Sequence, residues 1–128
     1  MEDLIIEGSH KDYFIPSVNF NAETGVCEIS GESFLEDTVD FYKPILSWLK
    51  EYTETVKKPL AFIIKLSYFN TSTSRSLLDI LNILKTYEEN DGELIINWHY
   101  DPQDVDMEED IEDYMIDTGL DINLIPVE

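Results

Sequence analysis

The sequence predicts an α/β domain, built on a mixed sheet that opens with an N-terminal β-hairpin and carries helices mainly on one face. Two observations predict it. Strand-like segments come first, and strand-like and helix-like segments then alternate to the end of the chain. Such alternation implies parallel strands joined by crossover helices. We expect one domain, 1–128, because 128 residues with 43% apolar side chains suffice for one core.

Short strands open the chain. Residues 4–6 are apolar and predict a weak strand. Residues 17–21 and 26–30 each alternate between polar and apolar side chains, and the turn residues 22–25 lie between them. This pattern is typical of a β-hairpin. Gly31 is expected to end it.

A helix and a central strand follow the hairpin. Asp37 or Thr38 is a suitable cap for a helix that runs to about Val56. Pro44 conflicts with its apolar pattern, because proline either belongs to a first helical turn or kinks a longer helix. Residues 60–69 predict a strand covered on both sides, since both of its faces are apolar. Its faces are Phe62, Ile64, Leu66 and Tyr68 on one side and Ala61, Ile63 and Phe69 on the other.

The rest of the chain repeats this alternation. Residues 70–74 are turn and capping residues before a second helix, which ends at 88–92. Residues 93–99 predict a strand, 107–117 a very acidic third helix, and 122–127 a last short strand. The sheet should therefore hold about five or six strands.

Charge excludes some partners. The chain has 8 Lys and Arg against 28 Asp and Glu, a net charge of −20. We expect no nucleic acid and no membrane as partners, because phosphate backbones and anionic lipids bind basic surfaces. Residues 101–128 hold eleven acids and no base. That region is either a solvated acidic face or a docking surface for a basic partner.

The chain also predicts a cytoplasmic setting. Cys27 is the single cysteine, so no intramolecular disulfide can form. The longest uncharged apolar run, 59–64, is far below the roughly 20 residues of a membrane span. The start of the chain is acidic and lacks the basic residues of a signal peptide.

Chemistry is most concentrated where the strand at 60–69 meets the second helix. Four consecutive hydroxyl side chains, Thr71, Ser72, Thr73 and Ser74, begin that helix, and Arg75 follows. A helix N-terminus offers unpaired N–H groups and a positive dipole end, where phosphate is favoured. Arg75, four residues after Thr71, is close enough to pair with an anion there. The simpler interpretation is capping by Ser or Thr.

Two motifs, taken together with their separation along the chain, resemble those of the SiaC family of bacterial regulatory phosphoproteins. The first is Tyr68-Phe69-Asn70-Thr71-Ser72 with Arg75, Asp79 and Ile80, and the second is Trp98-His99-Tyr100-Asp101. The resemblance runs from about Leu4 to Pro126, and the family is similar to STAS-domain anti-sigma-factor antagonists. It implies a STAS-like fold and a partner switch that is not an enzyme.

The resemblance also implies partners and sites. A serine/threonine protein kinase of the histidine-kinase-like ATPase fold would phosphorylate Thr71, and a metal-dependent serine/threonine phosphatase would reverse this. The unphosphorylated form would bind a downstream target, a diguanylate cyclase in the namesake system. Asn70, Ser72, Arg75 and Tyr68 would form the partner surface, with no cofactor, metal or catalytic residue. Thr73 and Ser74 stand beside the matching positions, so chemistry alone does not single out Thr71.

Two other functions stay open. One is a small acidic, metal-dependent enzyme that uses His99 with Asp101. Separately, Asp101, Asp104, Asp106 and Glu112 form a partial calcium-loop pattern, although Asp106 stands where such a loop has glycine. The other is an acidic decoy that occupies a nucleic-acid-binding site. Cys27 is expected in the core and not as a nucleophile.

Overall fold

A six-stranded mixed sheet in the order β1-β2-β3-β4-β5-β6 forms the frame. The computed structural model describes residues 1–11 and 13–127. The two hairpin pairs β1–β2 and β2–β3 are antiparallel, and β3 to β6 run parallel. The elements are β1 (Leu4–Ile6), β2 (Ser17–Phe20), β3 (Val26–Ser33), α1 (Thr38–Glu51), the π-helical turn η1 (Tyr52–Val56), β4 (Leu60–Phe69), α2 (Thr71–Glu89), β5 (Leu94–Tyr100), α3 (Val105–Thr118) and β6 (Asn123–Pro126).

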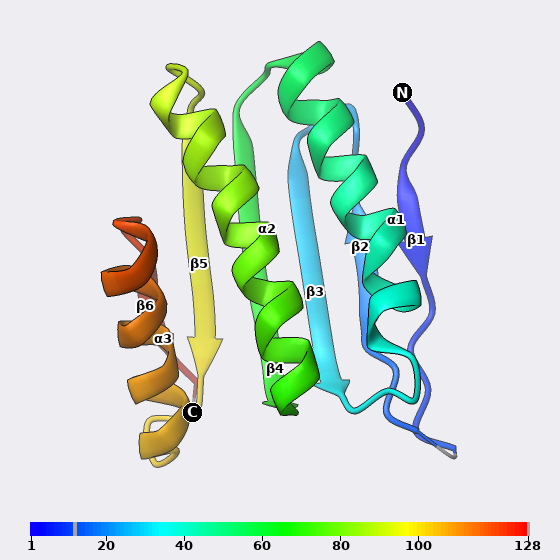
Figure 1. Ribbon diagram of the computed structural model, residues 1–128, viewed down its shortest axis with the longest axis vertical. Helices are drawn as coiled ribbons and strands as arrows, with labels where there is room; N and C mark the ends of the chain where they lie inside the picture. Colours follow the sequence, from blue (N-terminus) through cyan, green and yellow to red (C-terminus); the bar gives the residue numbers. More distant parts are fainter. Residues whose placement is uncertain (12, 128) are drawn as a thin grey trace.

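All helices lie on one face of the sheet (Figure 1). The cause is topological. Each parallel strand is laid beside the previous one in the same direction, and crossovers of one hand then place every helix on the same side. Within residues 1–11 and 13–127 the opposite face carries no helix, so the prediction that helices lie mainly on one face is confirmed. The carboxyl ends of β3, β4 and β5 meet at one edge, together with the start of α2 (Figure 1).

The core fills the space between the sheet and α1 and α2. Aromatic side chains dominate it: the Phe20 ring lies 5.2 Å from that of Trp48 and 5.7 Å from that of Phe62. Trp98 on β5 stacks on Tyr114 of α3 at 5.7 Å. Cys27 is fully buried, as expected. α3 is thereby attached to the sheet beside α2.

The expectation that β4 is covered on both sides is wrong. Phe62 and Ile64 are fully buried under the helices, but Ala61 and Ile63 on the other face are only half-buried. An apolar face of a strand does not by itself show that a helix covers it. Here the neighbouring strands alone shield these side chains.

A bulge changes the end of β3 and β4. The register shifts between Gly31 and Glu32, and Ser67 Oγ donates to the Gly31 carbonyl oxygen at 3.3 Å. Gly31 has φ 103°, a conformation that glycine adopts without strain. β3 therefore continues through Gly31 where the sequence predicted its end. The bulge also reverses the predicted faces, so Tyr68 is 47% exposed and Phe69 lies 6.3 Å from Trp98.

The helix ends follow the capping prediction. Asp37 accepts the Asp40 N–H at 3.1 Å and caps α1, and Asp104 accepts the Met107 N–H at 3.0 Å and caps α3. Pro44 stands inside α1, beyond its first turn, where its missing N–H leaves the Asp40 carbonyl without its helical bond. None of the helices in the described part of the chain is long and apolar enough to cross a membrane.

Candidate functional site at the start of α2

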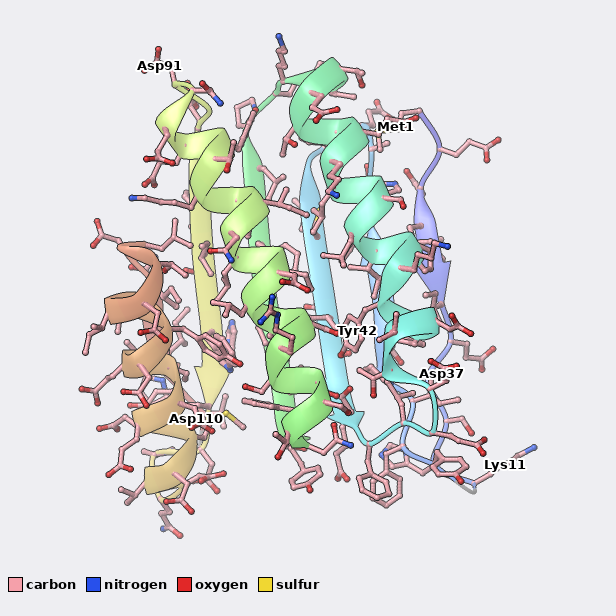
Figure 2. The ribbon with its side chains drawn as sticks, viewed as in Figure 1. Met1, Lys11, Asp37, Tyr42, Asp91 and Asp110 are labelled. Carbon is pink, nitrogen blue, oxygen red and sulfur yellow. The ribbon has the colours of Figure 1, made fainter. Side chains whose placement is uncertain are left out.

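The candidate site is the junction between β4 and α2. Asn70 connects them, and its backbone N–H donates to the Ser33 carbonyl oxygen at 3.2 Å. The end of β3 is thus tied to the start of α2. Asp37 and Lys11 lie at this same end of the molecule, and Asp91 lies at the opposite end (Figure 2).

Asn70 is the cap of α2. Its side-chain oxygen accepts the Thr73 N–H at 3.1 Å, the Thr73 hydroxyl at 2.8 Å and the Ser72 hydroxyl at 3.0 Å. Three donors on one amide oxygen fix the first turn of the helix. The cap predicted for residues 70–74 is therefore Asn70, and it holds the hydroxyls of Ser72 and Thr73.

Three of the four hydroxyls that follow make side-chain hydrogen bonds within the chain, although Ser72 is exposed. Thr73 is fully buried, and its Oγ1 lies 2.8 Å from Ser33 Oγ, which lies 2.9 Å from the Tyr42 hydroxyl. Ser72 Oγ lies 2.7 Å from the Thr38 hydroxyl at the start of α1. Ser74 lies against α3, and its Oγ is 2.9 Å from the Tyr114 hydroxyl.

Thr71 differs from these three. It is the first residue of α2, its side chain is exposed, and it makes no side-chain hydrogen bond to any residue in the ranges 1–11 and 13–127. It also stands at the positive end of the helix dipole, in a first turn without an acidic residue. A hydroxyl so placed is accessible to another protein, and a negative charge added to it is favoured by the helix.

Arg75 and Tyr68 flank Thr71 and are largely exposed. Arg75 Nε lies 3.3 Å from the Asp79 carboxylate, and the Arg75 side chain is 78% exposed. Arg75 is therefore held one turn away from Thr71 by a weak surface ion pair. Tyr68, 47% exposed, stands beyond the bulge on the face that carries no helix. The structure places the five residues predicted from the sequence at the carboxyl edge of the sheet, where β4 ends and α2 begins. They are Tyr68, Asn70, Thr71, Ser72 and Arg75.

Buried tyrosines connect the site to the other helices. Burial raises the pKa of Tyr42 to about 12, although its bonds to Ser33 and Thr73 act in the opposite direction. Burial also raises the pKa of Tyr114, as do the carboxylates of Asp110 and Asp117. Both side chains therefore remain neutral hydroxyls, fit to hold Ser33 and Ser74 by hydrogen bonds.

Sequence reasoning missed exposed aromatic side chains beside the junction. Phe34 is 43% exposed and follows Ser33, the residue that binds Asn70. Tyr13, 38% exposed, stacks on Phe34 at 6.4 Å, and Phe14 exchanges two backbone hydrogen bonds of 2.9 Å with Phe34. The only available signal was a phenylalanine beyond the expected end of the hairpin. Exposed aromatics near a polar site are typical of protein interfaces.

The residues of the enzyme hypothesis lie in a separate hollow. A cavity of about 380 Å³ between the ends of β4 and β5 is lined by His99, Asp101 and Asp104, among others. Both carboxylates already accept a backbone hydrogen bond: Asp101 accepts the Gln103 N–H at 2.9 Å, and Asp104 caps α3. Within the described residues, no three His, Cys, Asp or Glu side chains come together as a metal site. Asp106 and Glu112 lie within α3, so the calcium-loop pattern does not form a loop.

Comparison with known proteins decides the family. Residues 7–127 match the family model described as SiaC family regulatory phosphoprotein. This chain belongs to the SiaC family. A relative from Pseudomonas aeruginosa, an uncharacterised protein, is 25% identical over 117 residues, which cover 91% of this chain and 90% of the relative.

Solved SiaC structures share the fold. Apo-SiaC from Pseudomonas aeruginosa superimposes with a TM-score of 0.88 at 24% identity and covers 98% of this chain and 99% of its own. The crystal structure of the diguanylate cyclase SiaD in complex with its activator SiaC, also from that organism, gives a TM-score of 0.90 at 22% identity, with 98% and 100% covered. The mixed α/β sheet predicted for the chain is therefore confirmed, and it matches the fold of SiaC.

Proposed function

We propose that this chain is a non-catalytic partner switch, phosphorylated on Thr71 by a protein kinase of the histidine-kinase-like ATPase fold and dephosphorylated by a metal-dependent serine/threonine phosphatase. The unphosphorylated form binds and regulates a target enzyme in the cytoplasm. A diguanylate cyclase is the target we favour, because a SiaC structure at TM-score 0.90 is that of a cyclase activator.

The observation that carries this proposal is the contrast among the four hydroxyls. Ser72, Thr73 and Ser74 each form hydrogen bonds to other side chains; Ser72 is exposed, Ser74 is half-buried and Thr73 is fully buried. A kinase would have to break those bonds to reach them. Thr71 is exposed at the helix start, so its phosphorylation requires no local unfolding.

Charge explains how one phosphate can act as a switch. Phosphothreonine adds about −1.5 to −2 charges at pH 7. The helix dipole and Arg75, drawn away from Asp79, would stabilise this charge in the isolated protein. At an interface the same dianion must lose its water beside the exposed aromatics Phe34 and Tyr68, which disfavours binding. The switch therefore requires little movement of the backbone.

The first test is mapping of phosphate by intact-mass and peptide mass spectrometry, on protein from its native cell with and without phosphatase treatment. We expect one removable phosphate on Thr71. Thr71→Val should abolish it, whereas Ser72→Ala should retain it. Phosphate on Ser72, Thr73 or Ser74 instead would move the site, and a chain that carries none under several growth conditions would contradict the switch.

A second test measures target binding. The wild type, Thr71→Val and Thr71→Glu are compared for capture of a diguanylate cyclase from the native cell and then for affinity to the purified cyclase. Thr71→Val has the shape of threonine without a phosphate acceptor, so it should bind as the wild type does. Thr71→Glu should bind about 100-fold more weakly, which is close to 3 kcal/mol. Equal binding of both variants would reject Thr71 as the switch.

A further inference from the structure

The helix-free face of the sheet is unlike the rest of the molecule in charge. The chain carries 28 acidic residues, yet within the described strands the outward positions of this face hold two of them, Glu28 and, beyond the bulge beside Tyr68, Glu32. Glu28 is neutralised by Lys65, whose Nζ lies 3.0 Å from the carboxylate. His99 also stands at an outward position, on β5 next to Lys65. The face therefore carries little net charge for a molecule of net charge −20.

Apolar side chains stand exposed on this face. Ile5 is 70%, Ile95 56% and Val26 42% exposed, and they share the face with half-buried Ala61 and Ile63. The register aligns Val26, Ala61 and Ile95 in one row across β3, β4 and β5. A hollow of about 360 Å³ near the amino ends of β4 and β5 is lined by Ala61 and Ile95 of that row and by the acidic residue Glu93, among others. Exposed apolar surface of this extent marks an interaction site more often than chance.

The face is large enough for a small dimer interface, although its projected area is below that of a standard one. Strands lie about 4.8 Å apart and rise about 3.3 Å per residue, so the face projects to an area on the order of 500 Å². Side chains make the accessible surface larger than that projection. A standard interface buries about 800 Å² per partner, and sheets pack face to face about 10 Å apart.

We infer that this face binds a second copy of the chain, sheet against sheet, as a two-fold symmetric dimer. The charges are self-complementary: a two-fold axis that lies in the interface midway between Glu28 and Lys65 sets each carboxylate opposite the other copy's ammonium group. A basic partner would find little negative charge here, and an acidic one little positive charge. A second copy offers an apolar row to cover the apolar row of the first, and a Glu28–Lys65 pair to complement that of the first.

This dimer is independent of phosphorylation at Thr71. The apolar row Val26, Ala61 and Ile95 lies at the amino ends of the parallel strands, whereas α2 begins at their carboxyl ends (Figure 1). Both Thr71 side chains would stay accessible in the dimer. Salt should strengthen it, because screening the repulsion between two bodies of charge −20 outweighs the weakening of the two Glu28–Lys65 contacts.

The test is analytical ultracentrifugation of the full chain from about 5 to about 500 µM, at low and at moderate salt. We expect a monomer–dimer equilibrium that tightens with salt. Ile95→Lys should weaken it by at least roughly 10-fold, since symmetry counts each substitution twice. Ile116→Lys is the matched control, because Ile116 is 79% exposed on α3, and it should dimerise as the wild type does.

Charge reversal gives a second, sharper readout. Glu28→Lys places like charges opposite each other in its own dimer, and so does Lys65→Glu, so each alone should be weakened. An equimolar mixture of the two variants restores both opposite-charge contacts and should dimerise again. A wild type that stays monomeric over the whole range, or a mixture no tighter than either variant alone, overturns the dimer. If Ile95→Lys instead abolishes binding of a cyclase by a monomeric wild type, the face has another occupant and the dimer is again rejected.

Discussion

At the scale of single residues, two threonines of α2 should differ in what their hydroxyls contribute to stability: Thr73 should contribute and Thr71 should not. Thr73→Val should destabilise the protein by about 1–2 kcal/mol, because it removes a fully buried hydroxyl that bonds to Ser33 and Asn70. Thr71→Val should change stability by less than about 0.5 kcal/mol, since that hydroxyl is exposed. Urea unfolding followed by tryptophan fluorescence measures both. Equal losses in the two variants would contradict this account of the turn.

The sequence could place these four hydroxyls at a helix start, but it could not tell which of them are hydrogen-bonded to other parts of the chain. It predicted a capped helix start with an exposed phosphate-favouring turn, which follows from local composition. The partners that distinguish the four residues, Ser33, Tyr42 and Tyr114, come from segments 40 residues away or from other helices. Only tertiary structure brings them to the turn. Phe34 was missed for the same reason, because its neighbours belong to the loop before β2.

At the scale of elements, α3 carries more negative charge than its stability favours. Desolvation and the carboxylates of Asp113, Asp106, Asp104 and Glu109 raise the pKa of Asp110, so its charged form is disfavoured in the fold. Its side chain points outward from α3 (Figure 2). Asp110→Asn should therefore raise stability at neutral pH and low salt by a few tenths of a kcal/mol, after screening by solvent.

Thermal unfolding at low and moderate salt measures this effect of Asp110→Asn. The gain should shrink as salt screens the neighbouring carboxylates. Glu23→Gln is the control, because Glu23 is exposed in the turn between β2 and β3, away from that helix. A variant no more stable than the wild type, or a gain that grows with salt, would show that repulsion within α3 is not limiting.

The order and type of the helices and strands could be predicted from the sequence. What covers each strand, and where a bulge interrupts it, could not. Local periodicity and caps gave every helix and strand within a few residues, because those signals act over one or two turns. The coverage of β4 was misjudged, since a strand with two apolar faces has the same pattern whether a helix or only neighbouring side chains cover it. The bulge was hidden as well, because Gly31 looks like a strand end until its partner Ser67 is in place.

At the scale of the whole molecule, a net charge of −20 opposes folding through self-repulsion. Raising NaCl from about 0.01 to about 0.1 M shortens the screening length from about 30 to about 10 Å, so the urea midpoint should rise. Urea is required because guanidinium chloride is itself a salt. Ile95→Lys at low concentration serves as a control without self-association. A midpoint that falls with salt would mean that ion pairs stabilise the fold more than repulsion destabilises it.

The same molecule should lose stability in alkali through its buried tyrosines. Burial raises the pKa of Tyr42 to about 12, and it also raises the pKa values of Tyr52, Tyr87 and Tyr114. In the unfolded chain these hydroxyls ionise near pH 10, so the unfolded state loses protons first and stability falls as pH rises from about 10 to about 12. Below pH 10 both states hold the proton and the contribution is complete. Urea unfolding at pH 8, 10 and 11 measures the slope, which Tyr42→Phe should make shallower because it removes the most strongly shifted of these hydroxyls. An unchanged slope in that variant would place the alkaline sensitivity in other groups.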